Sequence, residues 1–151
     1  MNEKEVCTRI VNTFLDAGHE AFKIPDMPRT AGTKFNRVKG YDISASINYK
    51  AILIEAKIRK ANSLPKTLST FRKQFTPHQL KRFDRVTINN NAYCYAFVVL
   101  FKSSPIPAKR LHELYIVPWS DIVLDNYRPH FYAPTTSRKG LYQLNDFFNC
   151  F

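Results

Sequence analysis

The sequence has few cysteines and no long hydrophobic run, and both absences exclude classes of protein. Its three cysteines, Cys7, Cys94 and Cys150, lie far apart and form no Cys-x-x-Cys pair, and its four histidines are scattered. This pattern argues against a disulfide framework and a zinc site, and it favours the reducing cytoplasm. No run approaches the roughly 18 apolar residues of a membrane span. The first residues include acids and no apolar core, so we expect no secretion signal.

Acidic residues are scarce as well. The chain has 12 Asp and Glu against 23 Lys and Arg, which gives a formal net charge of +11. An excess of this size indicates a polyanionic partner such as nucleic acid, and a basic protein without such a partner is the alternative. The length of 151 residues fits a single domain, and 44% hydrophobic and 14% aromatic residues exclude a disordered chain.

Residues 40–58 predict a β-hairpin that places acids on a mostly buried sheet. Alternate positions are apolar in both arms, as expected for strands whose side chains alternate between two faces. The apolar faces consist of Tyr41, Ile43, Ala45 and Ile47 in the first arm and Ile52, Ile54, Ala56 and Ile58 in the second. Asp42, Glu55 and Lys57 project from the opposite face, which Leu53 indicates is half covered too. We therefore expect these three charged groups to converge.

Converging carboxylates repel each other, and a cation between them relieves the repulsion. A hard cation such as Mg²⁺ takes oxygen ligands of this kind. The spacing Asp42-x12-Glu55-x-Lys57 therefore indicates a candidate metal-binding and catalytic site. The structural alternative is a pair of strands with a surface salt bridge between Lys57 and one carboxylate.

Residues 3–17 predict an amphipathic helix that ends at Gly18. Its apolar stripe consists of Val6, Cys7, Ile10, Phe14 and Ala17. Glu3 projects onto this stripe, whereas Glu5 lies on the solvent face. Glu3 is therefore either a first-turn residue that the helix dipole favours or a carboxylate directed at the site.

Residues 26–39 predict a flexible basic loop just before Asp42. No hydrophobic periodicity is present, and the loop carries Arg29, Lys34, Arg37 and Lys39. At the mouth of the expected site, these side chains would contact phosphates. A solvated loop without a partner is the alternative.

A second helix is expected to begin at residue 77. Thr76 is a suitable N-cap, and Pro77 occupies the first helical position. Gln79 lies one turn into the helix, close to the expected end of the strand that carries Glu55. Gln79 is either a site residue or an ordinary polar residue of the helix.

The remaining segments complete a sheet with helices. Residues 92–101 form an apolar, β-branched and aromatic run that predicts a central strand buried on both faces. We also expect strands at 20–25 and 113–117, a short helix at 118–123, a short helix or tail at 142–151, and irregular structure at 125–140. Residues 59–75 are rich in Lys, Ser and Thr and are broken by Pro65.

The order of these elements resembles that of a known group of enzymes. Helix, strand, basic loop, Asp strand, Glu-x-Lys strand, helix, strand and strand is the order in the PD-(D/E)XK nuclease superfamily. Within it, the chain resembles the RecU-type Holliday-junction resolvases. That likeness rests on Ile54-Glu55-Ala56-Lys57, Ser63-Leu64-Pro65, Phe75-x-x-His78-Gln79, Ala96-Phe97-Val98-Val99 and Ser137-Arg138-Lys139. The resemblance implies an α/β fold with a restriction-endonuclease-like core, in which helices flank a central mixed β-sheet.

The chain departs from this family at two places. Tyr41 stands where the family usually has Pro or Thr before the Asp. The segment 26–39 is shorter than the family's insertion, which forms a stalk that helps to hold the junction. The second departure bears on junction preference more than on the chemistry.

The resemblance also implies an activity. A homodimer would use Mg²⁺, or Mn²⁺ as a substitute, to cut two opposed strands of a four-way DNA junction. Asp42, Glu55 and the carbonyl of Ala56 would hold the metal. Lys57 would position the attacking water and help to deprotonate it, and Gln79 would orient Lys57 or the water.

Further residues follow from the same resemblance. Resolvase-type members often place an acid on the first helix, followed by apolar residues three and seven positions on, and Glu3 fits this spacing. Counting back from the next strand favours Glu5 instead. Either acid would serve the site and, with Asp42, a second metal. The expected contacts to the DNA backbone are Arg29, Lys34, Arg37, Lys39, Arg138 and Lys139.

Three other functions remain open at the level of the sequence. The first is a nuclease of the same superfamily that cuts ordinary duplex or single-stranded ends. The second is a non-catalytic DNA-binding module on the same fold. The third is a basic protein whose partner is another protein.

Overall fold

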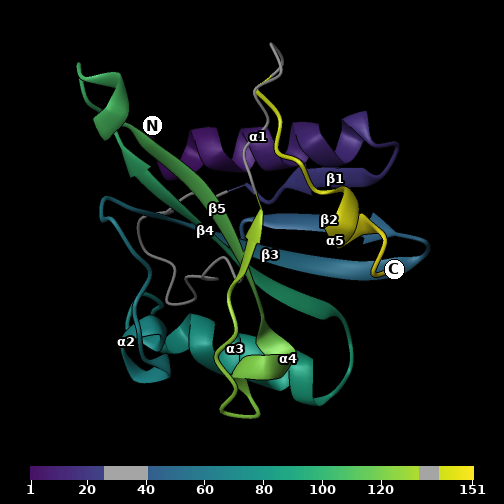
Figure 1. The fold of residues 1–151 in the computed structure, drawn as a ribbon. Coiled ribbons are helices and arrows are strands. Elements are labelled where there is room, and N and C mark those ends of the chain that lie inside the picture. The colour runs from purple at the N-terminus through teal and green to yellow at the C-terminus, as the bar shows by residue number, and fades with distance from the viewer. Residues whose placement is uncertain (26–40, 133–139) are drawn as a thin grey trace, which may run out of the picture.

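The computed structural model describes residues 1–25, 41–132 and 140–151, and a six-stranded sheet forms its centre (Figure 1). The strands are β1 (Glu20–Lys23), β2 (Ile43–Ile47), β3 (Lys50–Arg59), β4 (Tyr93–Lys102), β5 (Leu111–Pro118) and β6 (His130–Tyr132). They lie in sequence order, and every neighbouring pair is antiparallel except β3 and β4, which are parallel. The expected mixed sheet is therefore confirmed.

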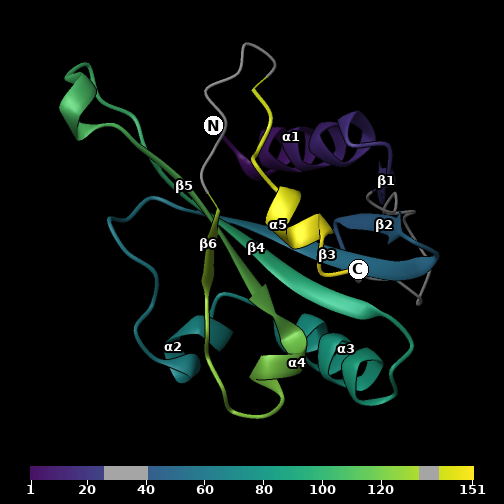
Figure 2. The same ribbon diagram turned by 45° about the vertical axis from the view of Figure 1, so that its right-hand side comes forward.

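Helices cover both faces of this sheet. They are α1 (Glu3–Asp16), α2 (Leu68–Arg72), α3 (Pro77–Ile88), α4 (Trp119–Ile122) and α5 (Asn145–Phe148), with a 3-10 turn η1 (Pro107–Lys109) between β4 and β5. Helices α1 and α5 lie on one side of the sheet and α2, α3 and α4 on the other, as Figures 1 and 2 show. The α/β class with a central mixed sheet between helices is thus confirmed. No helix in the described ranges has the length and apolarity that a bilayer crossing requires.

Each side of the sheet has its own hydrophobic core. The first core joins α1, α5 and one sheet face through buried residues such as Ile10, Phe14 and Phe147. The second joins the α2–α4 side to the other face through Phe71, Phe83 and Trp119. Strand β4 contributes to both cores, which confirms that it is a central strand buried on its two faces.

The β2–β3 hairpin forms as the alternation predicts. Its two-residue turn has Asn48 and Tyr49 at φ 49° and 64°, the left-handed conformation of the turn type that suits the twist of a hairpin. Ile43 pairs with Ile54 in the register. Ile43, Ala45, Ile47, Ile52, Ile54 and Ala56 are buried in the first core, and Ile58 packs against it. Leu53 packs against the second core, so the opposite face is partly covered as expected.

Tyr41 lies on the other side of the sheet from the one that we predicted. It belongs to the second core, where its ring stacks on that of Phe83 with centroids 5.1 Å apart. The reason is that β2 begins at Ile43, so the alternation of the strand does not extend back to residue 41.

Other expectations are wrong at short elements and element ends. The segment 125–140, expected to be irregular, contains strand β6, which pairs with β5. Helix α2, which Thr67 caps, lies in the segment 59–75, for which we predicted no element. Ala17 is exposed because α1 ends at Asp16. Helix α2 and strand β6 are too short to show a hydrophobic period, and their formation depends on tertiary contacts. The predicted basic loop 26–39 lies outside the described residues.

Replacement of Phe83 by Ala should destabilise the α3 side of the sheet strongly. The side chain is fully buried and packs against the rings of Tyr41, Phe75 and Trp119. We expect a loss of about 3–5 kcal/mol in the free energy of unfolding, measured by urea denaturation. Leu124→Ala, at a residue that is 76% exposed, should change it by less than about 0.5 kcal/mol. Equal effects of the two substitutions would contradict this packing.

Candidate active site

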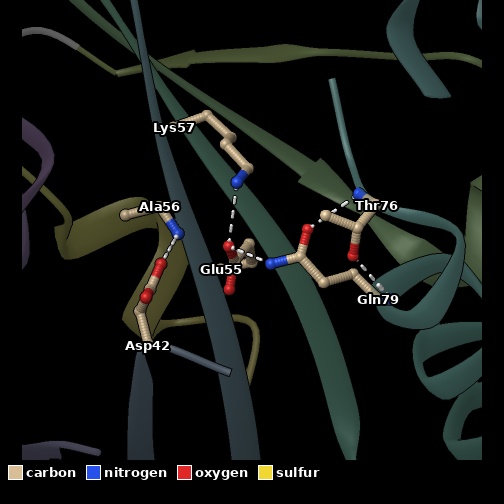
Figure 3. A network of polar contacts seen from close by, with 6 residues as sticks. All are labelled: Asp42, Glu55, Ala56, Lys57, Thr76 and Gln79. Atoms are coloured by element: carbon tan, nitrogen blue, oxygen red, sulfur yellow. Dashed lines mark hydrogen bonds and ion pairs between the residues drawn. The ribbon is translucent and has the colours of Figure 1, made fainter. Parts of the chain in front are cut away.

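Asp42 and Glu55 lie next to the first residue pair of the hairpin, Ile43 and Ile54. Asp42 comes just before Ile43, and Glu55 comes just after Ile54. Asp42 precedes β2, and its Oδ2 accepts a hydrogen bond from the backbone N–H of Ala56 at 2.9 Å (Figure 3). Its own N–H donates to the carbonyl of Ile54 at 3.1 Å. Asp42 is therefore hydrogen-bonded to β3 through both its side chain and its backbone. Strand β3 continues beyond Ile43, the first residue of β2.

Glu55 is a buried carboxylate in the middle of this site. The residue is 3% exposed. Its Oε1 accepts a hydrogen bond from Gln79 Nε2 at 2.7 Å and lies 3.0 Å from Lys57 Nζ (Figure 3). Its Oε2 is buried without a hydrogen-bond partner in the described part of the chain. A buried polar atom without a partner is costly, so Oε2 indicates a proton or a cation that completes the site.

The charge state of Glu55 depends on this environment. Burial and, after it, the nearby charge of Asp42 together raise the pKa of its carboxyl group from 4.5 to about 7, although the charge of Lys57 acts in the opposite direction. Near neutral pH the group is therefore poised between its two protonation states. A bound cation would hold it ionised, because metal ligands must be deprotonated.

Lys57 reaches the same carboxylate from the same strand. Residues 55 and 57 share a face of β3, as the period of a strand predicts. The ammonium group of Lys57 lies 5.6 Å over the ring of Phe75, and the side chain is 17% exposed. Lys57 is thus held at the edge of the site, with its charge directed at Glu55.

Gln79 is fixed by the cap of its own helix. Thr76 N–H donates to Gln79 Oε1 at 3.0 Å, and Gln79 N–H donates to Thr76 Oγ1 at 3.2 Å, which together form a capping box. Because Oε1 is engaged by Thr76, the amide nitrogen Nε2 is the atom that faces Glu55. The structure therefore gives Gln79 a direct contact with Glu55. Its expected role of orienting Lys57 or a water stays a prediction.

The two candidate glutamates of α1, Glu3 and Glu5, have different surroundings. Glu5 Oε2 accepts from Asn2 N–H at 2.9 Å and lies 3.6 Å from the N-terminal ammonium group, so Glu5 is engaged in capping α1. Glu3 instead lines a pocket of about 460 Å³ together with Asp42, Lys23 and residues of α1. Of the two candidates, Glu3 is the one near Asp42, and its function in the site stays a prediction.

The donor set fits a hard cation of the Mg²⁺ type. Within the described ranges, no group of three or more His, Cys, Asp or Glu side chains is arranged to hold a metal. Mg²⁺ usually takes only one or two carboxylates and obtains its other ligands from water and substrate phosphates. Asp42 and Glu55 supply two carboxylates, and the unpartnered Oε2 is an available oxygen ligand.

The predicted DNA-binding residues cannot be placed in this site. Arg29, Lys34, Arg37, Lys39, Arg138 and Lys139 all lie outside the described residues. Sequence reasoning also missed two contacts, the capping box that fixes Gln79 and the packing of Lys57 over Phe75. The pattern Thr76-x-x-Gln79 is a readable signal for the first. The second depends on tertiary structure and has no such signal.

Comparison with known proteins finds a distant likeness among solved structures. The sequence matches no protein-family model and no curated protein. Among solved structures, the chain is similar to Hjc, a Holliday junction resolvase from the archaeal hyperthermophile Archaeoglobus fulgidus, with 18% identity and a TM-score of 0.43. The likeness covers 78% of this chain and 75% of that chain. At this distance, the function has to be argued from the site itself.

Glu55→Gln should change how stability depends on pH. Between pH 4.5 and about 7, folded Glu55 retains a proton that the unfolded chain has lost, so its contribution to the free energy of unfolding falls as pH rises. The Tm of Glu55→Gln relative to wild type should therefore be higher at about pH 8 than at about pH 5, without divalent ions, by at least a few degrees.

The control is Glu20→Gln, at an exposed carboxylate of β1. Its Tm difference from wild type should change much less between the two pH values, because this side chain is exposed to solvent. A Tm difference for Glu55→Gln that is the same at both pH values would contradict the raised pKa of Glu55.

Proposed function

We propose that this chain is a single-domain, Mg²⁺-dependent endonuclease that hydrolyses phosphodiester bonds of DNA. The observation that carries the proposal is the buried Glu55, with its unpartnered Oε2, between Asp42 and Lys57 at the end of a hairpin. A structural ion pair has no need of a second acid whose charge opposes it. Two acids can, however, hold a cation that activates a water and neutralises a phosphate, and an amine beside them can orient that water.

Each residue has a distinct task in this mechanism. Asp42, Glu55 and the carbonyl of Ala56 would hold the cation, with Glu3 near enough to the pocket of Asp42 to contribute if a second one binds. When bound, Mg²⁺ lowers the pKa of a water and neutralises charge that develops on the phosphate. Lys57 would orient the attacking water and assist its deprotonation. Gln79 donates to Oε1 of Glu55, which leaves Oε2 as the oxygen available for binding.

The preferred substrate of the proposed enzyme is branched DNA, with a four-way junction as the first candidate. The resemblance to junction resolvases in residues 41–57 and 63–80 supports this choice. The net charge of +11 supports a nucleic-acid partner whose phosphates are contacted without reading base sequence. Cutting two opposed strands requires two sites, so the proposal includes a homodimer. The basic residues of 26–39 and 138–139 would hold the backbone.

Asp42→Asn should abolish cleavage of a synthetic four-way junction in Mg²⁺ while DNA binding is retained. Loss of the charge removes a cation ligand but keeps the shape of the side chain. We expect the rate of cutting to fall about a hundred- to a thousandfold, measured with end-labelled junctions on denaturing gels.

The matched control is Asp146→Asn, because Asp146 is an exposed acid on α5 outside the site. It should cut as wild type does. Full cleavage by Asp42→Asn would show that the site is misplaced. A wild-type protein that binds DNA and cuts none in Mg²⁺ or Mn²⁺ would favour the non-catalytic binding module.

A junction should be cut in preference to linear duplexes of the same arm sequences. Because recognition rests on branched shape, the cuts should lie at symmetric positions in two opposed strands. Mapping the 5′-labelled products of each strand separates this enzyme from a general nuclease. If linear duplex is cut as fast as the junction, junction selectivity is wrong and the protein is a nuclease of broader substrate range.

A further inference from the structure

The positive charge of the chain is concentrated in one segment. Residues 57–110 contain 12 of the 23 Lys and Arg but only one of the 12 Asp and Glu, which is Asp84. This segment therefore carries the whole net charge of +11, and the other residues, with 11 charges of each sign, are neutral together. Basic residues that only keep a protein soluble would be spread along the whole chain and not confined to one segment.

The one acid of this segment is engaged by two neighbours, although its side chain is 31% exposed. Asp84 Oδ2 lies 3.0 Å from Arg72 Nη2, and its Oδ1 accepts a hydrogen bond from Trp119 Nε1 at 2.8 Å. Its charge is therefore used to hold α2 and α4 against α3. The lysines and arginines on the outside of these helices are not offset by it.

Helices α2 and α3 present much of this charge to solvent. Phe83 and Leu80 pack α3 into the second core. Lys81 and Arg85, one turn apart, are exposed on the other side of the helix. Lys66 before α2 and Lys73 after it are exposed as well. The 12 residues of α3 span about 18 Å, long enough to follow several phosphates of a duplex.

This surface is continuous with the candidate active site. Arg82 follows Gln79 by three residues, and its guanidinium lies 5.5 Å over the ring of Tyr41, the residue that precedes Asp42. Gln79 itself contacts Glu55. A polyanion on the outer surface of α3 would therefore lie next to the two acids. Helix α1 on the opposite side of the sheet is not basic, since it has three acids and two basic residues.

We propose that the outer surface of α2 and α3 binds the sugar–phosphate backbone of a duplex DNA arm beside the active site. Its contacts are Lys66, Lys73, Lys81, Arg82 and Arg85. Single-stranded nucleic acid is usually held by exposed aromatic rings on which the bases stack. The Phe, Tyr and Trp residues of these two described helices are Phe71 and Phe83, both fully buried. Charge without a stacking surface fits a duplex, whose bases are already paired.

The proposal is tested by binding of a double variant, Lys81→Gln with Arg85→Gln, to a fluorescent duplex of about 30 base pairs. EDTA in the buffer prevents cutting. We expect affinity at low salt to fall on the order of tenfold. The slope of log K against log salt between about 50 and 200 mM should become shallower by about 2, because two phosphate contacts are lost.

The control removes the same charge elsewhere. Lys50→Gln with Lys109→Gln alters exposed residues at the start of β3 and in η1, two elements that are separate from α2 and α3 (Figure 1). Its salt slope should stay close to that of wild type, and both variants should keep the wild-type Tm. Equal losses in the two variants, or none in the α3 variant, would overturn the proposal. Tighter binding of single-stranded DNA would overturn the duplex assignment.

This inference rests on the proposed function in one respect, namely that the bound DNA arm lies beside a site that cuts DNA. A protein that binds duplex through Lys81 and Arg85 but cuts no DNA in Mg²⁺ would refute the enzyme and support the surface. A protein that cuts junctions, and whose α3 variant binds and cuts as wild type does, would refute the surface and support the enzyme.

Discussion

Burial of the Glu55 carboxylate is the constraint on which the site depends. An ionised carboxylate is strongly solvated in water, and in the sheet it must obtain that stabilisation from neighbours. Gln79 and Lys57 both contact Oε1, whereas Oε2 has no partner in the described residues. Asp42 increases the need for positive charge, because its own carboxylate disfavours the ionised form of Glu55. The arrangement is balanced only when a proton or a cation is added.

One helix organises both acids of the site. Gln79 at the start of α3 contacts Glu55, and Phe83 further along α3 stacks under Tyr41, the neighbour of Asp42 in the chain. The hairpin supplies the acids, and α3 fixes where they can lie. The second core, in which Phe83 packs against Trp119, thus serves the site as well as stability.

The sequence predicted the long helices and strands, which show several hydrophobic repeats, and it missed some of the short elements. Helix α1, the hairpin and the central β4 follow from their hydrophobic patterns, and α3 follows from its Thr76 cap and Pro77. Strand alternation places Glu55 and Lys57 on one face of β3. The side taken by Tyr41 and the existence of α2 and β6 depend on tertiary contacts that no local pattern contains. The sequence does carry a signal for the capping contact of Glu5, because Asn2-x-x-Glu5 has the spacing of a capping box.

The amide of Gln79 is shared between the cap of α3 and the Glu55 carboxylate. Its two ends are engaged at once, by Thr76 and by Glu55, so α3 cannot move at its first turn without altering how Glu55 is held. Thermodynamic linkage makes this coupling reciprocal. If Glu55 holds a cation as proposed, a ligand that favours one position of α3 would change the affinity for that cation, and the cation would change the affinity for the ligand by the same factor.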